Sequence, residues 1–154
     1  MNLNEASEFL KTLLAKTDNK SEKNVYEGFI QILSSLKNRD LTEDQLKLIR
    51  DKLSSLNLNE TTKNRKKYYK QRLSDFKAFL KSEFQFTTEK YYTEMGLIYG
   101  MIFGSGIGLT IGISIDPVFG TSIGMGIGIS LGMVIGMIYG SKNDAEAKRQ
   151  GRVI

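Results

Sequence analysis

Two hydrophobic patterns divide the 154-residue chain near residue 88. Before that point, apolar residues recur every three or four positions between polar and charged ones, which is the period of an amphipathic helix. The pattern predicts an all-α fold whose first part, residues 1–88, is a helical domain. We expect its helices at about residues 4–16, 22–37, 43–56 and 60–86.

Capping signals support two of these helices. Ser21 is expected to cap the second helix, and Thr42 with Gln45 three positions later forms a capping-box signal for the third. The apolar stripes predict a four-helix bundle core, although one face can instead serve as a partner-binding or lipid-binding surface. The expected core residues are Phe9, Leu10, Leu13, Leu14, Val25, Tyr26, Phe29, Ile30, Leu33, Leu36, Leu46, Ile49, Leu53, Tyr69, Leu73, Phe76 and Leu80.

Glycine at every fourth position dominates the second part of the chain, and large apolar residues fill most of the gaps. Between Met95 and Tyr139 the sole formal charge is Asp116. Each glycine costs a helix about 1 kcal/mol relative to alanine, so something must offset that cost. The row comprises Gly96, Gly100, Gly104, Gly108 and Gly112, then Gly120, Gly124, Gly128, Gly132, Gly136 and Gly140.

A bilayer offsets the cost, because an unsatisfied backbone in hydrocarbon is worse than a poor helix, and glycine lets two helices approach closely. Segments 95–115 and 118–139 are each long enough, at about 1.5 Å per residue, to cross a hydrocarbon core of about 30 Å. Asp116 and Pro117 form a corner between them, since proline disfavours helix at the preceding residue. The sequence therefore predicts a transmembrane helical hairpin over residues 89–140. A hairpin buried in a soluble protein is the alternative, but little else in the chain could enclose it.

A β-hairpin over residues 103–137 is a further alternative, because small and large residues alternate there with the period of a transmembrane strand. Interior glycine weakens strands, and the four-residue glycine period extends beyond the alternating region. The helical hairpin is therefore the preferred interpretation.

A second ridge of small residues lies two positions out of phase with the main glycine row, about 200° around each helix. A lone hairpin needs one small face per helix, so a second face indicates further neighbours, hence an oligomer, with this ridge facing them or lining a pore. The alternative is that its hydroxyls only bond their own helix carbonyls. The ridge comprises Gly106, Thr110 and Ser114 on the first helix and Ser122, Gly126 and Ser130 on the second.

The net charge of +5 equals that of residues 60–73, which contain the basic run 63–72. Because the run precedes a predicted membrane segment, we expect anionic lipid headgroups as its partner rather than nucleic acid. A solvated helix face is the alternative. The candidate headgroup ligands are Lys63, Arg65, Lys66, Lys67, Lys70 and Arg72.

Charge at the hairpin ends predicts its orientation. Thr87 or Thr88 is expected to cap the first membrane helix, and residues 141–154 to form a charged tail. Basic residues flank both ends of the hairpin and are missing from the corner, so the positive-inside rule places both termini in the cytoplasm. The expected location is a bacterial inner membrane.

Residues 95–140, with the similar segments GSGIGLTIGIS at 104–114 and GMGIGISLGMV at 124–134, resemble the glycine-zipper membrane proteins of bacteria, whose paired helices read GISIG and GMGIG. That resemblance implies close helix packing. Glycine zippers occur in channel and toxin oligomers. The chain contains no Cys or His, and its few acids in this region are too sparse for acid–base catalysis, so we expect neither an enzyme nor a cofactor.

Two functions fit these features. The first is an oligomeric membrane-permeabilising effector, of toxin or cell-suicide type, that self-associates through the main glycine rows and is controlled by the helical domain. The second is a membrane anchor or scaffold whose helical domain recruits a partner protein. The second ridge and the minimal corner favour the first.

Overall fold

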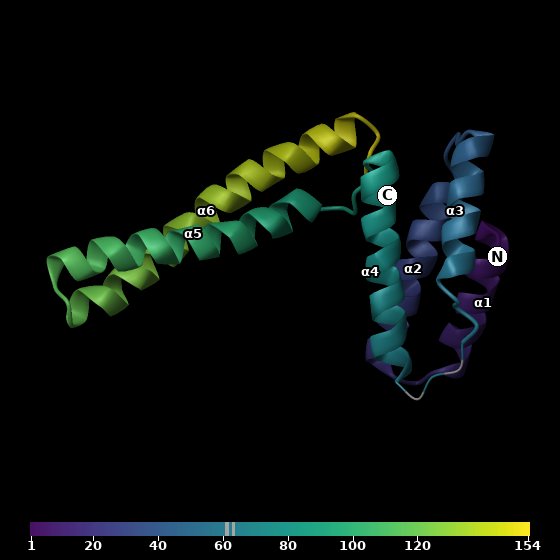
Figure 1. The fold of residues 1–154 in the computed structure, drawn as a ribbon, viewed down its shortest axis with the longest axis horizontal. Coiled ribbons are helices and arrows are strands. Elements are labelled where there is room, and N and C mark those ends of the chain that lie inside the picture. The colour runs from purple at the N-terminus through teal and green to yellow at the C-terminus, as the bar shows by residue number, and fades with distance from the viewer. Residues whose placement is uncertain (61, 63) are drawn as a thin grey trace. The chain divides into compact units, whose positions relative to one another are not determined.

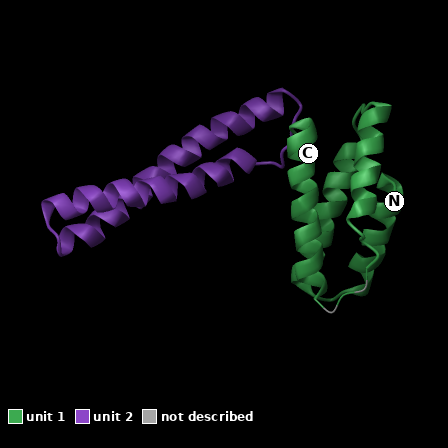
Figure 2. Ribbon diagram, in the orientation of Figure 1, with its two compact units in different colours: residues 1–86, 154 green, residues 87–153 purple. Residues whose placement is uncertain are grey.

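The structure is a computed structural model that describes residues 1–60, 62 and 64–154. These residues form six helices and no strand, which confirms the all-α fold and sets aside the β-hairpin alternative (Figure 1). The chain divides into two compact units, residues 1–86 with Ile154 and residues 87–153 (Figure 2). The helices are α1 (Leu3–Lys16), α2 (Lys20–Lys37), α3 (Glu43–Ser55), α4 (Arg65–Phe84), α5 (Tyr91–Ile115) and α6 (Phe119–Arg149).

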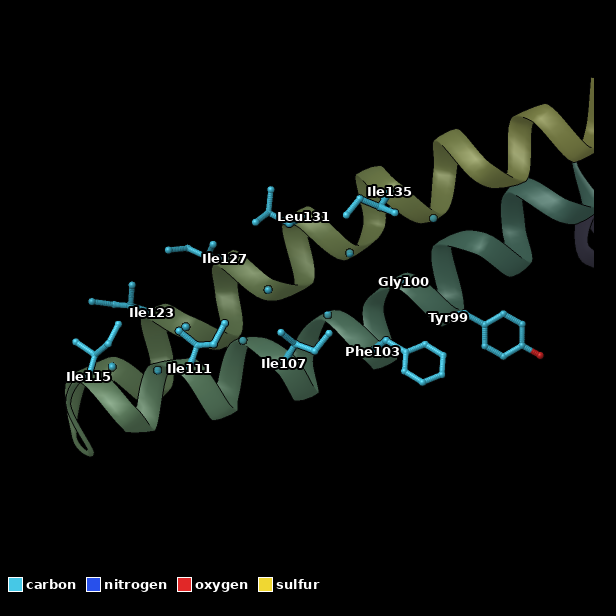
Figure 3. Close-up of a pocket in the computed structure, with 18 of the residues that line it drawn as sticks. Tyr99, Gly100, Phe103, Ile107, Ile111, Ile115, Ile123, Ile127, Leu131 and Ile135 are labelled. Carbon is cyan, nitrogen blue, oxygen red and sulfur yellow. The ribbon is translucent and has the colours of Figure 1, made fainter.

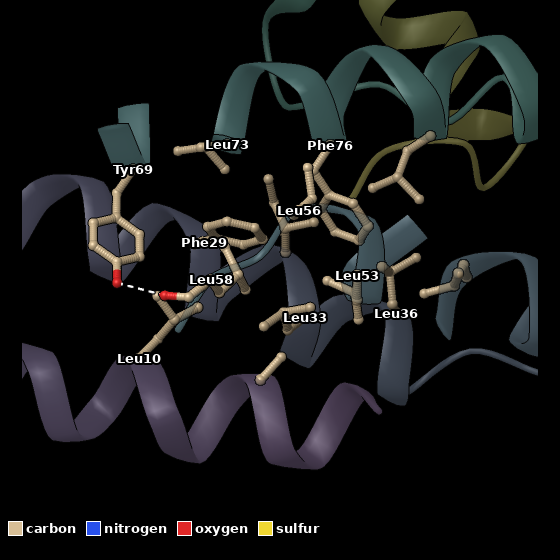
Figure 4. Packing of buried hydrophobic residues seen from close by; sticks show 14 of the residues in the cluster. Leu10, Phe29, Leu33, Leu36, Leu53, Leu56, Leu58, Tyr69, Leu73 and Phe76 are labelled. Atoms are coloured by element: carbon tan, nitrogen blue, oxygen red, sulfur yellow. Dashed lines mark hydrogen bonds between the residues drawn. The ribbon is translucent and has the colours of Figure 1, made fainter. Parts of the chain in front are cut away.

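The first unit is the predicted four-helix bundle. Helix α1 packs on α2 and α3, and α4 also packs on α2 and α3. Aromatic residues of α2 and α4 meet in the centre, where the ring centroids of Phe29 and Phe76 lie 5.4 Å apart (Figure 4). The predicted stripes supply most of this core, including the fully buried Leu10, Leu33 and Leu53.

The predicted helix starts are partly confirmed. Thr42 and Gln45 form the expected capping box at the start of α3. The prediction for α2 is wrong by two residues, because Asn19 rather than Ser21 is the cap. The side-chain oxygen of Asn19 accepts hydrogen bonds from the N–H groups of Ser21 and Glu22, so the helix already includes Ser21.

Helix α4 begins at Arg65 instead of near residue 60. The preceding loop is held in a non-helical path by two tyrosines of α4. The hydroxyl of Tyr68 donates to the carbonyl of Asn57, and that of Tyr69 donates to the carbonyl of Leu58, each at 2.7 Å (Figure 4 shows the second). Leu58 itself is buried, so the loop contributes to the core.

The second unit is a hairpin of α5 and α6. Helix α6 continues to Arg149, well beyond the predicted end at 139, so most of the expected tail is helical. The sequence DAEAK and its neighbours contain good helix formers, which explains the extension. Helix α6 then ends in a Schellman motif, with Gly151 in the left-handed region and the N–H of Arg152 bonded to the carbonyl of Ala147.

Neither Thr87 nor Thr88 caps α5, contrary to the sequence prediction. The backbone N–H of Thr87 donates instead to the carbonyl of Arg152, as part of a parallel bridge between Thr87 and Val153. The segments before α5 and after α6 are thereby joined. Residue Lys90 adopts a left-handed conformation at the start of α5 and provides no side-chain cap.

Candidate functional site

The two glycine rows face each other along the hairpin. A Cβ atom built on Gly104 would overlap the carbonyl oxygen of Gly128, and one built on Gly128 would overlap that of Gly104. The same reciprocal relation holds at each successive turn. The facing pairs are Gly96–Gly136, Gly100–Gly132, Gly104–Gly128, Gly108–Gly124 and Gly112–Gly120, and Gly140 meets the backbone of Tyr92 and Thr93.

The contact between the two backbones is continuous. A Cβ on Gly108 would lie 2.9 Å from the Cα of Gly128, closer than real Cβ contacts occur. A row with a period of four residues drifts around a straight helix of 3.6 residues per turn, so unbroken contact requires the helices to wrap around each other in a right-handed sense. Figure 1 shows α5 and α6 crossing along their length. The main glycine rows are therefore used within one chain to join α5 to α6.

The second small ridge faces away from this contact. A Cβ on Gly106 or Gly126 would meet nothing within 4 Å. The hydroxyls of the ridge bond their own helices: Thr110 donates to the carbonyl of Gly106, Ser114 to that of Thr110, and Ser130 to that of Gly126. All six ridge residues, Gly106, Thr110, Ser114, Ser122, Gly126 and Ser130, are exposed in the single chain.

An apolar groove of about 820 Å³ runs along one side of the hairpin (Figure 3). The glycine rows form its floor, and a row of large side chains from each helix forms a wall. Each wall residue except Ile115, which precedes Asp116, immediately precedes a glycine of the main row. The walls are Tyr99, Phe103, Ile107, Ile111 and Ile115 from α5, and Phe119, Ile123, Ile127, Leu131, Ile135 and Tyr139 from α6.

Side chains that follow the main-row glycines are less exposed than those that precede them. Leu109, Ile129 and Met133, which follow glycines, are half-buried. Ile107, Ile127 and Leu131, which precede the same glycines, are 62%, 56% and 59% exposed and line the groove.

The outer surface of the hairpin is unusually apolar. Large exposed hydrophobic residues occur along the hairpin from Ile98 to Tyr139. Among the described residues of the bundle, the one large exposed hydrophobic residue is Leu48. A soluble monomer rarely exposes so large an apolar surface. Both α5 and α6 are long and apolar enough to cross a membrane. From Ile98 to Ile115 the exposed apolar part of α5 measures about 26 Å at 1.5 Å per residue, close to a hydrocarbon core.

An aspartate closes each end of the hairpin. At the corner, Oδ1 of Asp116 accepts hydrogen bonds from the N–H groups of Val118 at 2.8 Å and Phe119 at 2.9 Å, which caps α6. These bonds, the one from Phe119 first, lower the pKa of the Asp116 carboxyl. At the other end, Asp144 caps α5 from across the hairpin: its carboxylate accepts from the N–H groups of Tyr92 and Thr93, each at 2.9 Å.

The role of Asp144 was missed in the sequence, because a cap from a distant helix leaves no local pattern. The corner at Asp116 and Pro117 was expected, and the aspartate cap explains why a turn this short is stable: it satisfies N–H groups that α6 would otherwise leave without partners.

From Arg65 onward the basic run lies on α4, where its residues do not share one environment. Arg65, Lys66, Lys67 and Lys70 are exposed. Arg72 instead places its guanidinium 4.6 Å from the ring centre of Tyr68 and 3.8 Å from Asp75, so it is engaged within the bundle. Lys63 lies outside the described residues.

Comparison of the chain with models of known protein families, with curated proteins and with solved structures found no match. The geometry of the hairpin and of α4 therefore carries the functional argument.

Proposed function

We propose that the protein is a non-enzymatic integral membrane protein whose α5–α6 hairpin spans a bilayer. The observation that carries this proposal is the contrast between the two units. The bundle hides its large apolar side chains, whereas the hairpin exposes them over the length of a hydrocarbon core. Water is a poor solvent for that surface and a bilayer is a good one.

The charges favour one orientation. Both ends of the hairpin lie away from the corner and contain basic residues, whereas the corner has the acidic Asp116. By the positive-inside rule, both termini then face the cytoplasm and the hairpin lies in a bacterial inner membrane. Reporter fusions to residues 1 and 154 test this topology: cytoplasmic signals from both support it, and signals from opposite sides mean that one helix does not cross. The basic residues at the ends are Lys90, Lys142, Lys148, Arg149 and Arg152.

Within the membrane, we propose that copies of the chain assemble and permeabilise the bilayer, as a toxin-type or cell-suicide effector. The outward ridge supports this function. It places small and weakly polar groups such as Thr110 and Ser130 on the outside of each hairpin, where they would line a pore between assembled copies. The bundle would control assembly, and the exposed Lys66, Lys67 and Lys70 of α4 would bind anionic lipid headgroups.

A second candidate, a membrane anchor that recruits a partner protein through the bundle, is favoured by a different observation. The main glycine rows are fully used inside the hairpin, so the abundance of glycine alone does not require an oligomer. Inducible expression with a membrane-potential dye separates the two functions. Rapid depolarisation supports permeabilisation, whereas normal potential and growth with the protein in the membrane fraction support the anchor.

A further inference from the structure

The contact between the two main glycine rows is already filled within one hairpin. Each main-row glycine from Gly96 to Gly136 lies against the backbone of the facing helix, with no room between them for even one carbon atom. Side chains of another copy therefore cannot enter between α5 and α6 without opening the hairpin. If copies associate, they must do so from outside this contact.

We propose that a second copy of the chain fills the apolar groove, so that a wall row of each copy lies over the glycine floor of the other. This inference rests on the proposed self-association and identifies its surface. The groove continues the established α5–α6 interface, because its floor is the edge of the same glycine rows (Figure 3). Each copy carries one groove with its own wall rows, so a two-fold pair fills both grooves.

The spacing of the groove fits a second helix row. Floor and walls both repeat every four residues, about 6 Å along a helix. A wall row from another copy has the same repeat, so its side chains can interdigitate with the first copy's walls, as ridges pack into grooves. A flexible lipid tail has no matching repeat. In a bilayer this kind of close packing is what drives helices together.

The walls offer apolar side chains on both sides of the floor. Eleven wall residues, all more than half exposed, line the groove. A wall row of a second copy would therefore contact both walls at once, which is the close packing that holds helices together in a bilayer.

The test measures association of the full chain in vesicles of phosphatidylcholine and phosphatidylglycerol. The natural sequence has no cysteine, so Ala15→Cys, at an exposed position of α1, allows donor and acceptor dyes to be attached. The groove variant carries Ile107→Trp and Ile127→Trp, which fill the groove from both walls. Ile107 and Ile127 are 62% and 56% exposed, so tryptophan fits there without disturbing the hairpin.

The matched control carries Ile102→Trp and Val134→Trp on the outer faces, where the exposed fractions are a similar 58% and 53%. Energy transfer should give apparent dissociation constants for the parent and the control that agree within about twofold. The apparent dissociation constant of the groove variant should be roughly tenfold higher or more. Helical circular dichroism of every variant excludes misfolding as the cause.

Any of three results would overturn the groove interface. The groove variant could associate as strongly as the parent. Association could be lost in the control alone, which would assign the interface to the outer ridge, or the parent itself could be monomeric, which would leave lipid acyl chains in the groove. Dye release from the same vesicles is read separately. Association through the groove without release would contradict permeabilisation while leaving the groove interface intact.

Discussion

Asp144 of α6 accepts two hydrogen bonds from Thr93 of α5, one from the backbone N–H at 2.9 Å and one from the hydroxyl at 2.6 Å. The two residues are 51 positions apart in the chain. The first N–H groups of a helix have no partner within it, and α5 has no side-chain cap from its own N-terminal residues. A carboxylate at this place also interacts favourably with the helix dipole. Asp144 thus joins the first turn of α5 to the C-terminal part of α6.

Replacing Asp144 with alanine should therefore loosen the first turn of α5. Loss of a helix cap costs about 0.5–2 kcal/mol, and amide hydrogen exchange at Tyr92 and Thr93 should accelerate accordingly in detergent-solubilised protein. Asp144→Asn keeps one acceptor oxygen and should give an intermediate rate. Unchanged exchange in the alanine variant would show that the cap contributes nothing to the hairpin.

The corner should respond to acid. Hydrogen bonds from Phe119 and Val118 lower the pKa of Asp116 in the folded hairpin, so its contribution to stability is complete above an ordinary aspartate pKa of about 3.9 and is lost as the pH falls through the folded value. Amide exchange at Val118 and Phe119 should increase in that acidic range. In Asp116→Asn the acid dependence at these two amides should disappear; its persistence would assign the titration to another group.

The bundle should respond to alkali through Tyr69. Burial raises the pKa of this buried tyrosine to about 12, and its hydroxyl donates to the carbonyl of Leu58. A raised folded pKa gives stability that is complete below the unfolded value of about 10 and is lost as the pH rises toward 12. Tyr69→Phe should cost about 1–3 kcal/mol at neutral pH, because a buried carbonyl loses its partner.

Denaturant unfolding of the tyrosine variant, followed by circular dichroism, measures both effects. Between pH 10 and pH 12 its stability should fall less steeply than that of the parent. An equal alkaline slope in parent and variant would mean that Tyr69 does not control this transition.

Much of the architecture follows from local pattern, and the departures have identifiable causes. The core stripe of α4, Tyr69 to Leu80, was predicted because helix period and burial coincide. The late start of α4 was not, since it depends on tyrosine hydroxyls that reach back to Asn57 and Leu58. Such contacts join residues that no capping motif connects.

The hairpin shows the same division. Its helical character and its corner at Asp116 were predictable from glycine spacing and from Pro117. The sequence also contained two small rows per helix, but spacing alone could not tell which row faces the other helix. The structure distinguishes them, because a Cβ on Gly104 meets Gly128 whereas one on Gly106 meets open space. The groove depends on how the wall side chains project, which no linear pattern records.

The main glycine row builds the hairpin, and the second row does not. Gly108→Ala and Gly106→Ala make the same chemical change two positions apart on α5. At Gly108 the added methyl meets the backbone of Gly124 and Gly128, so the helices must separate. At Gly106 it meets nothing within 4 Å, and alanine is the better helix former by up to about 1 kcal/mol.

Thermal unfolding of the two variants and the parent in one detergent, followed by circular dichroism, distinguishes the two rows. We expect a lower unfolding midpoint than the parent for Gly108→Ala and an equal or higher midpoint for Gly106→Ala. Equal midpoints for the two variants, or a larger loss at Gly106, would show that the main row does not hold the helices together.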